Sequence, residues 1–279
     1  IVNTQIDGVS RHVPLLRVLL LTFIAFLLSA CSAKTGVVVL SPGGVHKALD
    51  CVVLIHGLGR SSGSMKSMQD ALVQQGYETV NLGYPSTKKN IESIALEDYP
   101  MAVERCTDFK PQNIHFVTHS LGGIVLRKAF NDKKPENLGR VVMLSPPNQG
   151  SKLVDKIKTW WLFRKITGPA GQQLASGEDG VPFHLGKADF PLGIITGNSH
   201  AFFDAWFASI IPGLDDGKVS IESAQLDGMA DFLVTGDTHP FIMNSTYVQQ
   251  ESIHFLQHGR FAHRDISPEE TIGHDWYAE

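Results

Sequence analysis

The sequence IHFVTHSLGGIVL, residues 114–126, constrains the fold more than any other part of the chain. An apolar, β-branched run meets a turn of small residues that carries Ser120, and a helical pattern follows at once. This order predicts a nucleophile elbow, in which a strand passes through a strained turn into a helix and the serine hydroxyl stands clear of the sheet edge. Gly122 and Gly123 let the helix pass close to the incoming strand, where a Cβ would clash. The alternative is that Ser120 is only a helix N-cap, a position that suits serine.

Length and composition narrow the class of protein. A chain of 279 residues with 43% hydrophobic content can bury a sizeable core in one domain, with or without an insertion. The net charge of −4 leaves no basic excess, which argues against a nucleic-acid partner. Three cysteines are too few for a disulfide-built scaffold, and none has the spacing of a zinc ligand pair, so we expect no metal and no cofactor.

The N-terminal segment has the pattern of an export signal. Arg11 and Arg17 precede an apolar run over residues 18–28, which small residues follow. The run is shorter than the roughly 20 residues that a membrane-spanning helix needs. Residues 28–31, LSAC, resemble a bacterial lipobox, whose cysteine is lipidated after cleavage. We therefore expect a signal peptide over residues 1–30 and a lipid-anchored tether over residues 31–36 that begins at Cys31.

Two interpretations of this segment predict different locations for the mature protein. In the lipoprotein reading the acyl chain on Cys31 holds an exported, periplasm-facing protein at a bacterial membrane. Ser32 stands where an inner-membrane retention signal would usually show Asp, which favours the outer membrane. In the alternative reading the protein is simply secreted and Cys31 is incidental.

Strand-like and helix-like segments alternate through the rest of the chain. Continuous apolar runs predict buried strands, and apolar residues at helical spacing predict the helices between them. The expected strands cover residues 37–40, 51–55, 77–82, 114–117, 141–144, 192–197 and 231–235. One helix is expected directly after Ser64 and another directly after Ser120. Two more are expected over residues 91–106 and 246–258. This alternation predicts an α/β domain over residues 37–263, with a mostly parallel sheet, helices on both faces and a loose polar tail at 264–279.

Residues 146–191 interrupt the alternation. Connections of this length are usually functional or disordered, and the aromatic sequence WWLF at 160–163 argues against disorder. We expect a cap insertion that acts as a lid or binds an acyl chain. The alternative is a helical excursion that packs on the body and has no further role.

A nucleophilic serine needs a histidine to accept its proton and a carboxylate to orient that histidine. His239 fits the base, because it follows the last predicted strand and lies among turn-forming residues. Other histidines lie within the last helix or before the acidic loop, and they are less suitable: His184, His200, His254 and His258.

Two adjacent carboxylates could supply the acid of the triad. Asp216 is preferred over Asp215, because Gly217 would let the backbone turn that carboxylate towards the imidazole. Asp231 and Asp237 are too near His239 in sequence to reach it from another loop. The alternative is that Asp215 and Asp216 are solvated turn residues.

An oxyanion formed on the substrate would need backbone N–H donors. The sequence His56-Gly57 ends an earlier predicted strand, and the N–H of Leu58 would be one donor. The N–H of Leu121, directly after the serine, would be the second. We expect His56 and His119 to support these donors rather than to carry protons.

Four motifs occur in one order: IHGLG at 55–59, THSLGG at 118–123, DGKV at 216–219 and HPF at 239–241. In these motifs the chain resembles the α/β-hydrolase fold, specifically bacterial lipases and carboxylesterases. It is similar in pattern to the lipase-like group that includes deacylases of glycosylphosphatidylinositol lipids. The resemblance spans residues 51–261 and implies a serine carboxylic-ester hydrolase that acts on ester or lipid substrates.

Thr118 departs from this family pattern. Glycine usually stands there, two residues before the nucleophile, because the position demands a small side chain.

One set of alternatives keeps the triad and changes the reaction to acyl transfer, amide hydrolysis or thioester hydrolysis. Another is a catalytically inactive hydrolase fold that binds envelope lipid or a partner protein, which Thr118 would favour.

Cys51 and Cys106 each precede a predicted strand, and these two strands would be neighbours. Because an exported protein meets oxidising conditions, we expect a disulfide between them at the N-terminal edge of the sheet, far from Ser120. The alternative is a pair of buried free thiols.

Overall fold

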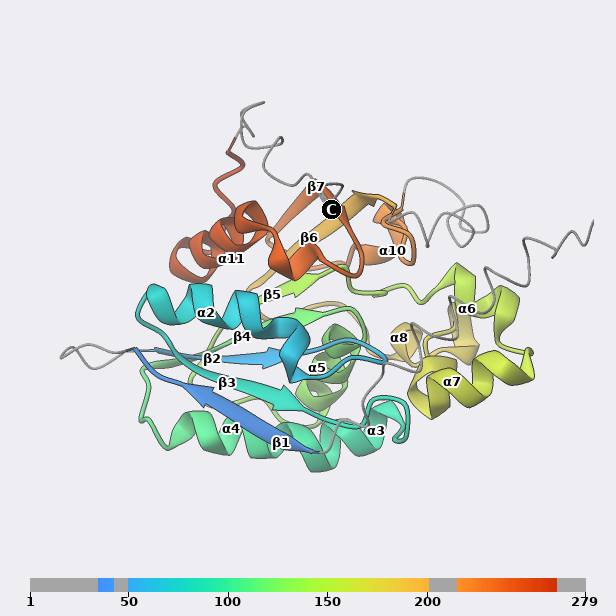
Figure 1. Cartoon of the computed structure of the whole chain (residues 1–279), viewed down its shortest axis with the longest axis horizontal. Helices are drawn as coiled ribbons and strands as arrows, with labels where there is room; N and C mark the ends of the chain where they lie inside the picture. Colours follow the sequence, from blue (N-terminus) through green and yellow to red (C-terminus); the bar gives the residue numbers. More distant parts are fainter. Residues whose placement is uncertain (1–34, 43–49, 201–214, 265–279) are drawn as a thin grey trace, which may run out of the picture.

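The computed structural model describes residues 35–42, 50–200 and 215–264, and these residues form a seven-stranded sheet covered by helices on both faces (Figure 1). The strand order is β1-β3-β2-β4-β5-β6-β7. Only the pairing of β1 with β3 is antiparallel. The strands are β1 Gly36–Leu40, β2 Asp50–Ile55, β3 Glu78–Gly83, β4 Asn113–His119, β5 Leu138–Leu144, β6 Leu192–Ser199 and β7 Asp231–Thr238.

Alternate residues of the central strands point into two separate cores. On β2, Val52 and Leu54 pack on one side with helices α2 (Lys66–Gln74) and α11 (Thr246–His258). Val53 and Ile55 pack on the other side with α3 (Ile91–Ser93), α4 (Tyr99–Thr107) and α5 (Leu121–Asp132). Both faces of the sheet are therefore covered, as continuous apolar strands require.

Strands β2 and β4 lie side by side at the point where the connections change direction. The chain leaves β2 to pair β3 on one side and later enters β4 on the other side. In open α/β sheets this switch is where ligands bind, beyond the carboxyl ends of the strands. The segments after β2 and β4, which begin with His56 and Ser120, therefore lie at the position expected for a site.

The predicted helix over residues 91–106 is divided into three parts. A short π-helix, η2 (Ile94–Asp98), separates α3 from α4. Pro100 lies at the start of α4 and has no N–H to donate to the preceding turn. The change of hydrogen-bond pattern before α4 follows from that missing donor. The last predicted helix, over residues 246–258, is α11.

Residues 146–191, predicted as a cap, carry their own helices beyond the carboxyl ends of the strands (Figure 1). These are α6 Lys152–Ile157, α7 Trp161–Gln172, η3 Gly177–Asp179 and α8 Val181–His184. Arg127 of α5 is buried and donates to the carbonyl oxygens of Asn148 at 3.0 Å and Gly186 at 2.7 Å. Gln173 accepts from the N–H of Ile91 at 2.7 Å. The base of this segment is therefore fastened to the body at two places.

The remaining short elements are η1 Ser62–Met65, α10 Ile221–Ala224 and η5 Ile242–Asn244. The predicted signal peptide, Cys31 and residues 265–279 of the predicted tail lie outside the described residues. Across the residues that are described, no helix is long and apolar enough to cross a membrane.

A disulfide joins Cys51, at the start of β2, to Cys106 of α4. Their Cα atoms are 5.9 Å apart and both residues are fully buried. The bond lies at the opposite end of β2 from Gly57 and Leu58.

Removing this bond should destabilise the protein without changing the geometry at the far edge of the sheet. The bridged residues are 55 positions apart, and closing a loop of that size stabilises a fold by roughly 2–4 kcal/mol. We expect the double variant Cys51→Ala, Cys106→Ala to lose that much free energy of unfolding in urea, while its circular dichroism spectrum below the unfolding transition stays that of the parent. Two thiols that react with iodoacetamide before any reduction would contradict the bond.

Candidate active site

Ser120 occupies the single residue between β4 and α5. Its φ of 52° and ψ of −121° are sparsely populated for a residue with a side chain. Two hydrogen bonds hold this conformation: the N–H of Ser120 donates to the Leu144 carbonyl at 2.9 Å, and the N–H of Gly123 donates to the Ser120 carbonyl at 2.9 Å. The turn therefore has the strained strand-to-helix geometry expected of a nucleophile elbow.

Two glycines and Thr118 determine how tightly the elbow packs. A Cβ on Gly122 would lie against the carbonyl oxygens of Ile55 and His56. A Cβ on Gly123 would lie 3.3 Å from Thr118 Oγ1. Thr118 thus fits where a smaller residue is usual, because Gly123 leaves room for its hydroxyl group. That hydroxyl is buried and has no hydrogen-bond partner among the described residues.

His239 directly follows β7 and lies beside Ser120. Its Nε2 is 3.1 Å from Ser120 Oγ, and its Nδ1 is 2.8 Å from Asp216 Oδ2. A carboxylate can only accept, so Nδ1 carries the proton and Nε2 is left to accept the hydroxyl proton of Ser120. The structure therefore brings together Ser120, His239 and Asp216 in one hydrogen-bonded chain.

Asp216 is fully buried and held by backbone donors. Its Oδ1 accepts from the N–H of Val219 at 2.9 Å and of Lys218 at 3.1 Å. Burial by itself would raise the pKa of this carboxyl, but the His239 ring and the Val219 N–H outweigh burial and hold the pKa below its ordinary value. Asp216 is therefore ionised beside His239 at neutral pH.

Asp215, the alternative acid, points elsewhere. Its Oδ1 accepts from the N–H of Gly217 at 2.7 Å and lies 3.0 Å from His200 Nε2. Burial raises its pKa. Gly217, the next residue but one, has a φ of 100°, which glycine adopts without strain.

The loop after β2 lies against the elbow. Gly57 is so close that a Cβ there would be 3.1 Å from Ser120 Cβ. The Gly57 carbonyl accepts from the N–H of Arg60 at 3.3 Å, which closes a turn around Leu58. Leu121 is the first residue of α5, so its N–H has no acceptor within the helix. The two predicted oxyanion donors, Leu58 and Leu121, thus belong to segments that meet at Ser120.

The loop after β3 contributes contacts that we did not predict from the sequence. Tyr84 stacks on the His56 ring with centroids 4.1 Å apart, and its hydroxyl donates to the His56 carbonyl at 2.5 Å. Ser86 Oγ accepts from the N–H of Gly59 at 2.9 Å. The sequence GYPS at 83–86, directly after a predicted strand, was the available signal, because such segments gather at the carboxyl edge.

His119 links the elbow to the loop that carries His239. Its Nε2 lies 3.0 Å from the His239 carbonyl oxygen, which can only accept, so Nε2 is the protonated nitrogen. Its Nδ1 is buried without a partner among the described residues and faces Gly57. His119 therefore contacts the loop that carries His239 and the loop after β2 at once.

His56 and His119 are neutral supports rather than proton carriers. Burial lowers the pKa of His56 to about 4. Burial, with a contribution from His239, holds the pKa of His119 well below its ordinary value. The other candidate histidines bind elsewhere, since His184 lies 2.9 Å from the Glu178 carbonyl oxygen and His254 lies 2.9 Å from that of Arg260.

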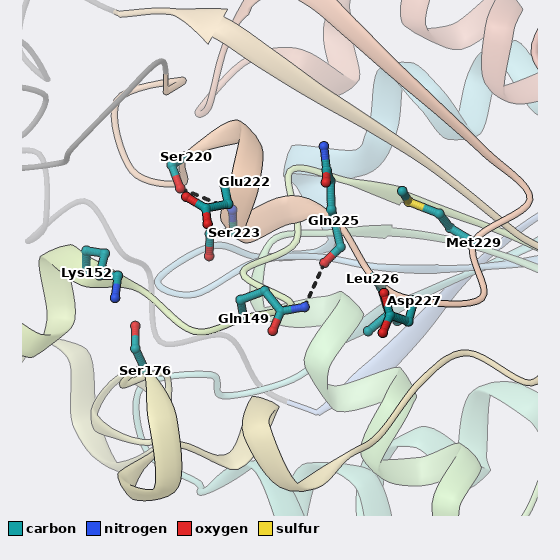
Figure 2. Close-up of a pocket in the computed structure, with 10 residues that line it drawn as sticks. All are labelled: Gln149, Lys152, Ser176, Ser220, Glu222, Ser223, Gln225, Leu226, Asp227 and Met229. Atoms are coloured by element: carbon teal, nitrogen blue, oxygen red, sulfur yellow. Dashed lines mark hydrogen bonds between the residues drawn. The ribbon is translucent and has the colours of Figure 1, made fainter.

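A polar cavity of about 380 Å³ lies between the start of α6 and α10 (Figure 2). Figure 2 shows Gln149 reaching across it to the Gln225 carbonyl oxygen, at 3.1 Å. Neither Ser120 nor His239 is among its lining residues, so it is separate from the hydrogen-bonded chain. Among the described residues no cluster of three or more metal-ligating side chains occurs.

Comparison with known proteins gives matches to solved structures alone. No protein-family model matches the sequence, and no curated protein matches it. A Bacillus licheniformis lipase, BlEst2, is similar with a TM-score of 0.62 and 18% identity over 80% of this chain and 97% of the lipase. The Legionella pneumophila phospholipase PlaB has a TM-score of 0.56 and 19% identity over 74% of this chain and 57% of PlaB. A Thermogutta terrifontis esterase has a TM-score of 0.51 and 13% identity over 81% of this chain and 94% of the esterase. The chain therefore has the α/β-hydrolase fold, as its motifs predicted.

The buried histidines should make the protein unstable in acid. His56 has an ordinary pKa near 6.5 when unfolded and about 4 when folded. Between these values the unfolded chain binds a proton that the folded chain does not, so stability is complete above about pH 6.5 and is lost as the pH falls. At pH 5 the loss from His56 alone is roughly 2 kcal/mol, and His119 adds to it. Urea unfolding at pH 7.5 and pH 5 measures the difference.

A comparison of variants identifies His56 as the source. His56→Gln should show a smaller loss between the two pH values, even if it is less stable at both. His184→Gln, a change at an exposed site, should show the same loss as the parent protein. An equal free energy of unfolding at both pH values would contradict this account.

Proposed function

We propose that the protein is a serine hydrolase of carboxylic esters that works through an acyl-enzyme intermediate. The observation that carries the proposal is the hydrogen-bonded chain from Ser120 Oγ through His239 to Asp216, with distances of 3.1 Å and 2.8 Å. Serine is a weak nucleophile unless a base accepts its proton, and the chain offers that base with an ionised carboxylate behind it. The α/β-hydrolase folds of a lipase, a phospholipase and an esterase add support at the level of the fold.

Each residue has one role in the proposed reaction. Ser120 Oγ attacks the acyl carbon while His239 Nε2 takes the hydroxyl proton. Asp216 keeps the proton on Nδ1 and stabilises the imidazolium that forms. The N–H groups of Leu58 and Leu121 bind the oxyanion. His239 then gives its proton to the leaving alcohol. It next removes a proton from a water molecule that attacks the acyl carbon, and it returns that proton to Ser120 Oγ as the acyl group leaves as a carboxylic acid.

The proposed substrates are lipid esters. The aromatic segment 146–191 supports this, because a Cβ on Gly171 of α7 would lie 3.1 Å from Leu58 Cδ2, beside the proposed oxyanion loop. Apolar side chains such as that of Leu58 next to the reacting centre favour an acyl chain over a polar substrate. One similar structure is a lipase and another a phospholipase, which agrees with this substrate class.

We propose that Cys31 carries a lipid anchor and that the exported protein faces the periplasm from the outer membrane. The support is the sequence alone: the apolar run at 18–28, LSAC at 28–31, and Ser32 after the cysteine. An anchored enzyme would meet ester lipids at the surface to which it is attached. The disulfide between Cys51 and Cys106 agrees with an oxidising compartment.

Replacing the nucleophile tests the hydrolase. Ser120→Ala should lower kcat for p-nitrophenyl esters roughly 10⁴-fold or more, because no hydroxyl remains to form the acyl-enzyme. A fluorophosphonate should label the parent protein at Ser120 and leave the variant unlabelled. No turnover of short or long acyl esters together with no labelling would overturn the proposal in favour of an inactive binding protein. An assay in which water and an added alcohol compete as acyl acceptors separates hydrolysis from acyl transfer. A transferase would form mainly the ester of the added alcohol.

The two neighbouring aspartates form a matched pair that tests the acid. Asp216→Asn removes the acceptor for His239 Nδ1–H and should lower kcat about 10⁴-fold at neutral pH. Asp215→Asn keeps an oxygen for the Gly217 N–H and should lower kcat less than about tenfold. Steady-state kinetics on one soluble ester measures both. A larger loss for Asp215→Asn than for Asp216→Asn would refute the assignment.

A further inference from the structure

The cap segment exposes two consecutive tryptophans. Trp160 precedes α7 and is 51% exposed, and Trp161 begins α7 and is 72% exposed. Indole rings contribute more binding energy than almost any other side chain once removed from water, so exposed pairs often mark an interaction surface. Among the described residues, the large exposed aromatic side chains all lie in the cap segment or just after His239: Trp160, Trp161, Phe183 and Phe241.

Basic side chains surround these tryptophans. Residues 152–165 hold five lysines and arginines and one acidic residue, in a chain whose net charge is −4. The acidic residue, Asp155, already accepts from the N–H of Ser176 at 2.8 Å. Lys158 pairs with Asp179 at 2.8 Å. The local charge therefore has the opposite sign to that of the whole protein.

Helical spacing brings apolar and basic groups onto the same faces. Trp161 and Lys165 are four residues apart on α7, and both are exposed. Lys152 and Lys156 are four residues apart on α6, and both are exposed. We call five exposed side chains on these two helices and at the residue just before α7 the cap face: Lys152, Lys156, Trp160, Trp161 and Lys165.

The cap face belongs to an element that is fixed beside the proposed oxyanion loop. Close contacts of Gly168 with Thr87 and of Gly171 with Leu58 seat the far end of α7 on the body. Trp161 precedes Gly171 by ten residues, and α7 bends between them, because Gly168 has a non-helical φ of 65° and Pro169 follows it. Figure 1 shows α6 and α7 beyond the carboxyl ends of the strands, where Ser120 lies. A partner bound to the cap face would therefore lie close to the candidate active site.

We propose that the cap face docks onto the surface of an anionic phospholipid bilayer. Tryptophan concentrates at the level of the lipid headgroups, and lysines are attracted to anionic headgroups around it. The cap face combines exposed indole rings with basic residues. Binding to an apolar protein groove or to a neutral lipid surface would not require the basic residues, so the combination favours an anionic bilayer. The proposal extends the proposed function by placing ester lipids at the cap, and it adds a membrane contact that does not depend on Cys31.

Vesicle binding tests the cap face without turnover. The chain from residue 31 onward with Cys31→Ser and Ser120→Ala, which carries no signal peptide, no acyl anchor and no nucleophile, is sedimented with vesicles. We expect at least tenfold stronger binding to phosphatidylcholine vesicles that contain phosphatidylglycerol than to pure phosphatidylcholine vesicles. We expect Trp160→Gln with Trp161→Gln to weaken the binding at least tenfold, and Lys152→Glu with Lys165→Glu to abolish the preference for anionic vesicles.

Two matched controls separate the cap face from general apolarity and charge. Leu96→Gln changes another side chain that is 72% exposed, and it should leave binding unchanged. Lys133→Glu with Lys110→Glu makes the same change in net charge at the opposite edge of the sheet, and the anionic preference should persist. Equal binding by the cap variants and the control variants would overturn the proposal. A parent protein that binds neither kind of vesicle would also overturn it and would point to a protein partner instead.

The same substitutions in the chain that retains Ser120 distinguish this proposal from the proposed hydrolase. Hydrolysis of a soluble short-chain ester should stay within about twofold of the parent, because the changed side chains point into solvent. Loss of vesicle binding with soluble esterase activity intact supports the cap face alone. An inactive parent that still binds anionic vesicles through the tryptophans would refute the hydrolase and leave the docking surface standing.

Discussion

The close approach of α5 to the end of β2 is the contact on which the rest of the site depends. Gly122 lies against the carbonyl oxygens of Ile55 and His56, so the elbow and the loop after β2 form one packed unit. The chain can enter α5 there only by reversing within one residue, which gives Ser120 its φ of 52°. Such a conformation costs of the order of 1–3 kcal/mol and persists only where the surroundings determine it. Here the surroundings are the hydrogen bonds to Leu144 and Gly123 and the absence of two Cβ atoms.

Polar contacts then align the loops around that elbow. His239 is held by its backbone as well as by its ring, because its N–H donates to the Asp216 carbonyl at 3.0 Å and its carbonyl accepts from His119. The loop that carries His239 is thus tied both to the loop that carries Asp216 and to β4, the strand that precedes Ser120. The supporting histidine is neutral because burial disfavours its cation, so it does not place a positive charge beside His239. In the proposed mechanism, His239 therefore needs little reorganisation before it accepts the proton of Ser120.

The sequence predicted what repeats along the chain and missed what depends on distant contacts. Apolar runs identified β2, β4 and β6, and chain order brought Ser120, Asp216 and His239 to one edge. The helix expected over residues 91–106 is present, but it contains the π-helical turn η2, which helical periodicity does not register. The contact of Tyr84 with His56, 28 positions away, depends on neighbouring strand ends, and GYPS after a predicted strand was its one sequence signal. The fit of Thr118 likewise depends on the space left by Gly123, five residues later.

The uneven distribution of charge would affect the orientation of the bound protein as well as its affinity for the membrane. A chain with a net charge of −4 is repelled as a whole by an anionic surface, so only an approach with the basic segment forward is favourable. At physiological ionic strength these forces act over about 8 Å, which makes the nearest side chains decisive. Binding and orientation would then arise from the same distribution of charge. Because Trp161 begins α7 and Gly171 near its other end lies beside Leu58, that orientation would turn the carboxyl edge of the sheet towards the bilayer. A lipid ester would have to move only a short distance out of the membrane to reach Ser120, and the cost of exposing its acyl chain to water would be correspondingly small.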